Sequence, residues 1–221
     1  MQIYAHRGAS ADFPEHSAEA YFGAIKQGAD GFECDLRLTK DGVAVLWHDA
    51  DEVATSTLSE LQNIKPDLMT IDDFLDIAIT HKKNVAIETK HPVPSGNAIE
   101  EVVIRKLEEH NAGKKIEVSL MSFSLLAVNF LKKKSNYEVV QLIEDRLFAI
   151  KSRISTPDVF APSINVIRQH PEVVKKFHDN DKKVFVWTVD YDADIELCEN
   201  LGVDVLITNI PSQARKVLGY S

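Results

Sequence analysis

The stretch GFECDLRLTKDGVAVLWHD, residues 31–49, contains the pattern that decides the fold. Apolar and acidic residues alternate from Gly31 to Leu36, as expected for a strand. A second strand-like run, Val43 to Trp47, follows after only a few residues. A parallel return would need a dozen or more residues, so the two runs must form an antiparallel hairpin. The pair Asp41-Gly42 predicts a two-residue type I′ turn between them.

Counting outward from this turn predicts which residues face each other across the hairpin. Lys40 should lie opposite Val43, and Asp35 opposite His48. Strand alternation places Glu33 and Asp35 on one face, and direct opposition adds His48 to that face. The sequence therefore predicts two carboxylates and an imidazole close together.

Outside the hairpin, short apolar or β-branched runs alternate with segments of helical period, which is the pattern of βα units around a parallel sheet. The eight runs are Ile3 to Ala5, Gly31 to Leu36, Asn84 to Glu88, Ile116 to Leu120, Tyr137 to Leu142, Val159 to Ala161, Lys183 to Val189 and Val203 to Ile207. Expected helices are Ala18 to Lys26, Ile71 to Thr80, Ala98 to His110, Ser124 to Lys133, Asp145 to Ser152, Pro171 to Asp179, Ala193 to Asn200 and Pro211 to Leu218.

Eight units in 221 residues leave about 28 residues each, close to the minimum for a closed (β/α)8 barrel. We therefore expect one α/β domain over residues 1–221, a TIM barrel with an extra β-hairpin after its second strand. Residues Ala50 to Met69 are expected to form a loop with one helical turn near Ser59 to Gln62.

Composition excludes several classes of partner. A formal charge of -9 argues against broad binding to nucleic acid or to an anionic membrane surface, both of which need a basic face. No apolar run approaches the ~18 residues of a membrane span, so no stable membrane insertion is expected. The first residues do not resemble a signal peptide, and two cysteines suit a reducing compartment, so we expect a cytoplasmic location.

Chemically capable side chains gather where the predicted strands end, which is where (β/α)8 barrels place their active sites. The second and third strands bring Glu33, Asp35 and Glu88 to this end. Three neighbouring carboxylates cannot all stay ionised unless a cation balances their charge. They therefore predict a divalent metal site, and all-oxygen ligation suits Ca²⁺ or Mg²⁺.

Two histidines, His6 and His48, remain outside this ligand set and are suited to general acid and base roles near neutral pH. Arg7 offers a bidentate fork for a phosphoryl oxygen. Together these groups predict metal-assisted transfer or hydrolysis at a phosphoester. Trp187 and Phe123 either stack over a substrate's alcohol group or plug the barrel mouth.

With these residues in these positions, the chain resembles the glycerophosphodiester phosphodiesterase family. The motifs that carry the resemblance are His6-Arg7-Gly8, Pro14-Glu15-His16-Ser17, Gly31 to Leu36, Thr39 to Asp49, Ile87-Glu88-Thr89-Lys90, Ser122-Phe123, Trp187-Thr188-Val189-Asp190 and Thr208 to Pro211. The resemblance implies a TIM-barrel enzyme that releases glycerol 3-phosphate and an alcohol from small-molecule glycerophosphodiesters, using Ca²⁺ or Mg²⁺. By matching position it implies catalytic His6 and His48, metal ligands Glu33, Asp35 and Glu88, a phosphate-binding Arg7 and a phosphate-holding Lys90.

The chain also departs from the family's pattern. His16 and Ser17 of this chain stand where the family's usual Pro-Glu-Asn-Thr motif has Asn and Thr. Asn209 stands where the family usually has Asp after the late Thr. We expect these changes to tune the site and not to abolish it. Residues 49–87 lack the inserted lobe that covers the glycerol in many members. Two other functions stay open: a phospholipase D-like enzyme acting on lysophospholipids, and a non-catalytic barrel that binds phosphorylated small molecules.

Overall fold

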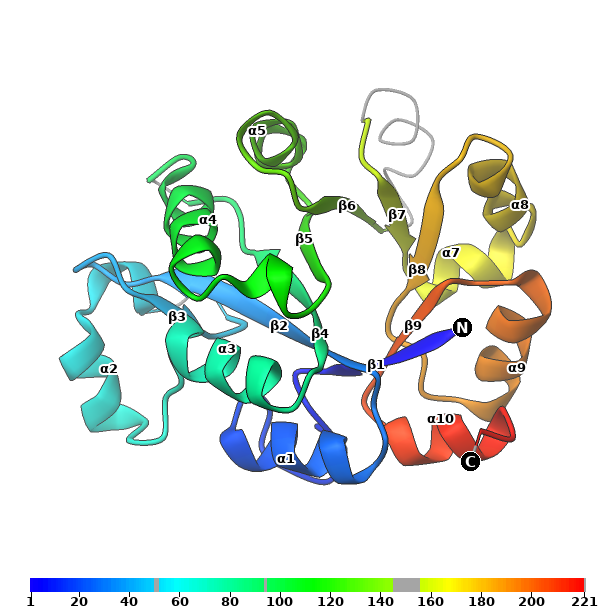
Figure 1. Cartoon of the computed structure of the whole chain (residues 1–221), viewed down its shortest axis with the longest axis horizontal. Helices are drawn as coiled ribbons and strands as arrows, with labels where there is room; N and C mark the ends of the chain where they lie inside the picture. The colour runs from blue at the N-terminus through cyan, green and yellow to red at the C-terminus, as the bar shows by residue number, and fades with distance from the viewer. Residues whose placement is uncertain (50–51, 94, 145–155, 221) are drawn as a thin grey trace.

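The computed structural model describes residues 1–49, 52–93, 95–144 and 156–220, and its centre is a closed barrel of parallel strands (Figure 1). In chain order the barrel strands are β1 (Gln2–His6), β2 (Gly31–Leu38), β4 (Asn84–Thr89), β5 (Val118–Ser122), β6 (Glu138–Ile143), β7 (Val159–Pro162), β8 (Lys183–Val186) and β9 (Val205–Thr208). Each strand pairs with the next, and β1 pairs with both β2 and β9, which closes the barrel. The predicted (β/α)8 barrel is confirmed.

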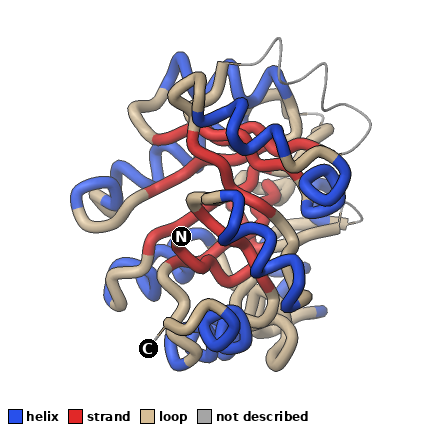
Figure 2. The backbone as a smooth tube through the Cα atoms, turned by 90° about the vertical axis from the view of Figure 1, so that its right-hand side faces the viewer, coloured by secondary structure: helices blue, strands red, loops and turns tan. Residues whose placement is uncertain are grey.

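Helices surround the strands, as Figure 2 shows from the side. They are α1 (Ala18–Lys26), α2 (Leu58–Ile64), α3 (Ile71–Thr80), α4 (Ala98–Glu109), α5 (Leu125–Lys134), α7 (Ile164–Gln169), α8 (Glu172–His178), α9 (Asp192–Leu201) and α10 (Pro211–Val217), with single 3₁₀ turns η1 (Val53–Thr55) and η2 (Ala112–Lys114). The turn expected near residues 59–62 is α2. Helix α7 was not predicted, because its six residues are too few to show a helical period. The helix expected near Asp145 to Ser152 falls outside the described residues, and none of the described helices has the length and apolar character needed to span a membrane.

Alternation along β2 explains how one strand serves both the core and the site. Phe32, Cys34 and Leu36 are completely buried in the layer between the strands and the helices. The residues between them, Glu33 and Asp35, therefore point into the barrel. Below these two acids the barrel interior is filled by apolar side chains, namely Tyr4, Ala86, Met121, Val140, Leu142, Val159, Ala161, Phe185, Val205 and Ile207.

The hairpin after β2 is present, but its predicted turn and register are wrong by one residue. Strand β3 (Ala44–Leu46) runs antiparallel to β2 with Leu36 opposite Leu46. A type I′ turn needs positive φ at both central residues, whereas in this loop only Gly42 has it, at +81°. The Gly42 N–H donates to the Thr39 carbonyl, which makes a three-residue loop. Asp41 instead accepts hydrogen bonds from the Thr39 hydroxyl and from the first N–H of α2.

Candidate active site

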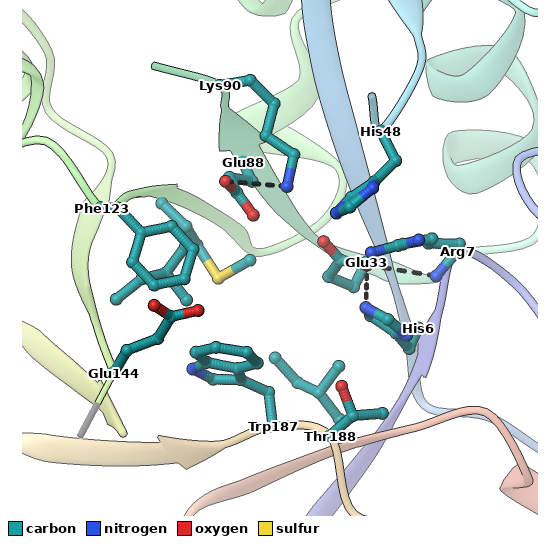
Figure 3. A pocket seen from close by; sticks show the side chains of 13 residues that line it. His6, Arg7, Glu33, His48, Glu88, Lys90, Phe123, Glu144, Trp187 and Thr188 are labelled. Carbon is teal, nitrogen blue, oxygen red and sulfur yellow. Dashed lines mark hydrogen bonds and ion pairs between the residues drawn. The ribbon is translucent and has the colours of Figure 1, made fainter. Parts of the chain in front are cut away.

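Three carboxylates, those of Glu33, Asp35 and Glu88, meet at the C-terminal end of the barrel, where the sequence predicted a metal site. Figure 3 shows two of them, Glu33 and Glu88. Asp35 in β2 pairs with Glu88 in β4, and Glu33 in β2 pairs with His6 in β1. All three acids are buried, and one oxygen from each lies within 4.8 Å of the others. The barrel register therefore brings the three predicted metal ligands together.

These carboxylates do not share one ionisation state. Burial and the neighbouring Asp35 raise the pKa of Glu88 to about 8. Burial, Asp35 and Glu88 raise the pKa of Glu33 well above its ordinary value. Burial alone would raise the pKa of Asp35 too, but a hydrogen bond from His16 and the charge of Lys90 hold it well below the usual range. The cluster needs further positive charge to ionise fully, and a hard divalent cation matches this all-oxygen donor set.

The two cationic side chains predicted to bind phosphate contact this cluster. Lys90 Nζ lies 2.9 Å from Asp35 Oδ1 and 3.1 Å from Glu88 Oε1. Arg7 Nε lies 2.9 Å from Asp35 Oδ2, although its N–H is not directed at an acceptor. The Arg7 guanidinium also donates from Nη1 to Glu15 Oε2 at 2.7 Å. Both cations therefore stand at the rim of the acidic cluster.

His6 is held by a relay of hydrogen bonds behind the pocket. Its Nδ1 lies 2.7 Å from Asn209 Oδ1. The Asn209 amide is oriented by Asp190, which accepts from Asn209 Nδ2 at 2.6 Å and from the Asn209 backbone N–H at 2.8 Å. Burial and the charge of Arg7 lower the pKa of His6 to about 4. The ring is therefore neutral near pH 7, and its Nε2 lies 3.9 Å from Glu33 Oε2.

The structure brings His48 to the same pocket, but not by the predicted pairing. The Trp47 N–H donates to the Asp35 carbonyl at 3.0 Å, so Trp47 and not His48 lies opposite Asp35. The chain has left β3 by His48, whose carbonyl accepts two hydrogen bonds from the Arg37 guanidinium. The His48 side chain is 38% exposed, and its Nδ1 lies 2.9 Å from Asp49 Oδ1.

The opposite half of the pocket is aromatic and apolar (Figure 3). Phe123 and Trp187 meet edge to face with ring centroids 5.4 Å apart, above the interior apolar layer. The cavity between the two halves has a volume of about 130 Å³. Glu144 also lines it and was missed from the sequence. Inward alternation along β6, through Val140 and Leu142, reaches Glu144 two residues later and could have found it.

His16, where the family's usual pattern has Asn, is buried beside Asp35 of the acidic cluster. Its side chain is 2% exposed. Its Nε2 lies 3.1 Å from Asp35 Oδ2, and its Nδ1 lies 3.2 Å from the Tyr21 hydroxyl oxygen. Burial lowers the pKa of His16 despite the nearby carboxylate of Asp35. The sequence indicated only that this residue tunes the site.

Comparison with known proteins identifies the family. The model of the glycerophosphoryl diester phosphodiesterase family matches residues 6–213. The chain belongs to this family. This phosphodiesterase family member is 30% identical to a Mycobacterium tuberculosis protein named "Probable glycerophosphodiester phosphodiesterase 1". The match covers 96% of this chain and 90% of the M. tuberculosis protein.

Other proteins align with this glycerophosphoryl diester phosphodiesterase family member over similar lengths. The glycerophosphodiester phosphodiesterase of Caldanaerobacter subterraneus is 28% identical, over 95% of this chain and 94% of that protein. A solved phosphodiesterase from Oleispira antarctica, in complex with the product sn-glycerol-3-phosphate, shares the fold with a TM-score of 0.86. It is 16% identical, and the match covers 99% of this chain and 97% of that one.

Proposed function

We propose that this family member hydrolyses glycerophosphodiesters to glycerol 3-phosphate and an alcohol in a reaction that depends on Ca²⁺ or Mg²⁺. The observation that carries the proposal is the buried cluster of Glu33, Asp35 and Glu88 beside two imidazoles and an arginine. The three carboxylates would hold the cation, which when bound stabilises negative charge on the phosphate oxygens. Family membership, and the activity named for its relatives, supports the substrate class.

His6 is the general base in this proposal. Because the Asn209 amide nitrogen is engaged by Asp190, the amide oxygen is the atom that faces the ring of His6. An amide oxygen only accepts, so His6 Nδ1 carries the hydrogen and Nε2 has a free lone pair at the pocket. Nε2 takes the proton from the attacking hydroxyl group, which belongs either to water or to the substrate's own glycerol.

His48 is then the general acid. The attacking oxygen forms a bond to phosphorus while the bond from phosphorus to the leaving oxygen breaks, and that oxygen takes a proton from the His48 ring. The Asp49 carboxylate beside Nδ1 keeps a hydrogen on that nitrogen, so Nε2 is the atom that exchanges a proton with the leaving group. Arg7 stands between the two imidazoles in the pocket lining, placed to bind a phosphate oxygen (Figure 3).

The aromatic half of the pocket would receive one arm of the diester. Phe123 and Trp187 offer flat apolar faces, and Glu144 offers a hydrogen-bond acceptor for hydroxyl groups. Lys90 would add positive charge beside the phosphate from the side of Glu88.

The test is the release of glycerol 3-phosphate from a panel of substrates, measured by a coupled dehydrogenase assay. We expect turnover of glycerophosphocholine, glycerophosphoethanolamine and glycerophosphoglycerol. Lysophosphatidylcholine, assayed in parallel for choline release, tests the alternative of a phospholipase D-like enzyme acting on lysophospholipids. Preference for the lysolipid, or no turnover of any diester by folded protein supplied with Ca²⁺ and Mg²⁺, contradicts the proposal. Phosphorus NMR during turnover distinguishes the two nucleophiles, because attack by the glycerol hydroxyl passes through a cyclic phosphate.

A further inference from the structure

The loop between β1 and α1 holds His16 in a fixed and unusual conformation. The residue has a φ of +59°, a region that few residues other than glycine enter and that Asn, Asp and His enter most often. Its backbone N–H donates to the Arg7 carbonyl at 3.0 Å, and the next residue, Ser17, caps α1 by accepting from the Ala20 N–H. The backbone therefore directs the buried imidazole toward Asp35 of the acidic cluster.

The hydrogen-bonding capacity of the neighbours decides where the proton on this imidazole lies. The ionised Asp35 carboxylate can only accept, so His16 Nε2 must carry the hydrogen that bridges the 3.1 Å to Asp35 Oδ2. In a neutral ring Nδ1 then has a free lone pair, and the Tyr21 hydroxyl, 3.2 Å away, is in reach to donate its hydrogen either to this nitrogen or to the Glu33 carbonyl. When it donates to Nδ1, a chain of two hydrogen bonds runs from Tyr21 through His16 to Asp35.

Tyr21 is a rigid anchor for this chain. It is completely buried on α1, and its ring packs against Phe32 at 5.2 Å and against Phe74 at 5.0 Å between centroids. Its hydroxyl also lies 3.3 Å from the Glu33 carbonyl, the alternative acceptor for its single hydrogen. The hydroxyl is thus fixed in place beside the strand that carries two of the three acids.

We propose that His16, held by Tyr21, is a positioning residue that orients the Asp35 carboxylate for cation binding. The inference rests on the proposed metal-dependent function and adds to it a residue outside the ligand set. His16 engages Asp35 Oδ2, the oxygen that Arg7 also approaches. Oδ1 is left on the side of Glu88, as the position of Lys90 between these two acids shows. Mutation of a residue that hydrogen-bonds to a metal ligand commonly lowers metal affinity by 10- to 100-fold.

Three variants separate positioning from simple packing. His16→Phe keeps an aromatic ring but removes both nitrogens, and His16→Gln returns an N–H at a similar reach. Tyr21→Phe removes only the hydroxyl and keeps the buried ring. His178→Gln is the matched control, because His178 Nε2 makes a comparable contact, 2.9 Å from Asp204 Oδ2, beside the N-terminal end of β9.

The measurement is calorimetric titration of the cation-free full-length protein with Ca²⁺ and with Mg²⁺, without substrate. We expect His16→Phe to raise the dissociation constant by about 10- to 100-fold and His16→Gln to stay within about threefold of wild type. Tyr21→Phe should raise it by a smaller factor, and His178→Gln should leave it unchanged. Nitrogen-15 NMR of histidine-labelled wild type should show His16 protonated on Nε2 and bare on Nδ1, with this preference weakened in Tyr21→Phe.

Wild-type affinity in folded His16→Phe would overturn the proposal. If His16→Phe does not fold because its positive φ disfavours a bulky residue, wild-type affinity in Tyr21→Phe together with an Nδ1-protonated His16 would overturn it equally. Failure of the proposed function would give a different result. The wild-type protein itself would then bind neither cation, or it would release no glycerol 3-phosphate.

Discussion

We predict that the cation-free protein loses stability as the pH rises from 7 to 8, because Glu88 must ionise there. Burial and Asp35 raise the pKa of Glu88 from its ordinary 4.5 to about 8. Between these values the folded state binds a proton that the unfolded state has lost, so stability falls as the pH rises. The stabilisation is fully present below pH 4.5 and is lost as the pH passes 8.

Integrating one such titration from pH 7 to 8 gives a loss of about 1 kcal/mol, or about 2–4 °C in Tm for a chain of this length. Glu33, whose pKa is also raised, acts in the same direction. Burial lowers the pKa values of His6 and His16, which adds stability as the pH rises, but that change is nearly complete by pH 7.

The assay is thermal unfolding in EDTA across this pH range, compared with the same scans in Ca²⁺ or Mg²⁺. Cation binding favours the ionised cluster, so it should flatten the slope. Glu88→Gln should lose most of the slope even in EDTA, because an amide does not titrate. An equal slope in wild type and Glu88→Gln, or a Tm that rises from pH 7 to 8 in EDTA, would refute the reasoning.

The remaining predictions concern catalysis and the hairpin. His6→Ala and His48→Ala should each lower kcat by about 10²- to 10⁴-fold with an unchanged circular dichroism spectrum, and wild-type turnover in either folded variant removes that residue from the acid and base pair. Glu33→Ala should abolish turnover without rescue by added Ca²⁺ or Mg²⁺, so wild-type turnover of the variant at the cation concentration that the wild type needs would exclude Glu33 as a ligand. Gly42→Ala should cost about 1 kcal/mol in urea unfolding, since its φ is +81° with open space around it; an unchanged midpoint would show that the loop adapts.

The fold was predictable because strand alternation and chain spacing are local properties of the sequence. The inward position of Glu33 and Asp35 follows from the apolar residues between them, and the barrel register then brings Glu88 alongside. The family motifs pointed to the same residues. Period and spacing therefore located all eight barrel strands, although their bounds differ by up to three residues from those predicted.

The predictions that failed depend on contacts that spacing does not report. The hairpin register shifted because the Asp41 side chain is engaged by Thr39 and by the start of α2, so only Gly42 takes a positive φ. The buried contact between His16 and Asp35 depends on one positive φ in a loop, which the sequence pattern does not specify. The orientation of Asn209 likewise emerges only with Asp190 in place.

The most direct test of the central claim is a cation titration of the hydrolysis of glycerophosphocholine. Protein dialysed against EDTA should release no glycerol 3-phosphate, and stepwise addition of Ca²⁺ or Mg²⁺ should restore turnover along a saturating curve that is absent for Glu33→Ala. Full turnover in excess EDTA, or a wild-type protein that both cations leave inactive, would contradict a metal-dependent phosphodiesterase built on these three carboxylates.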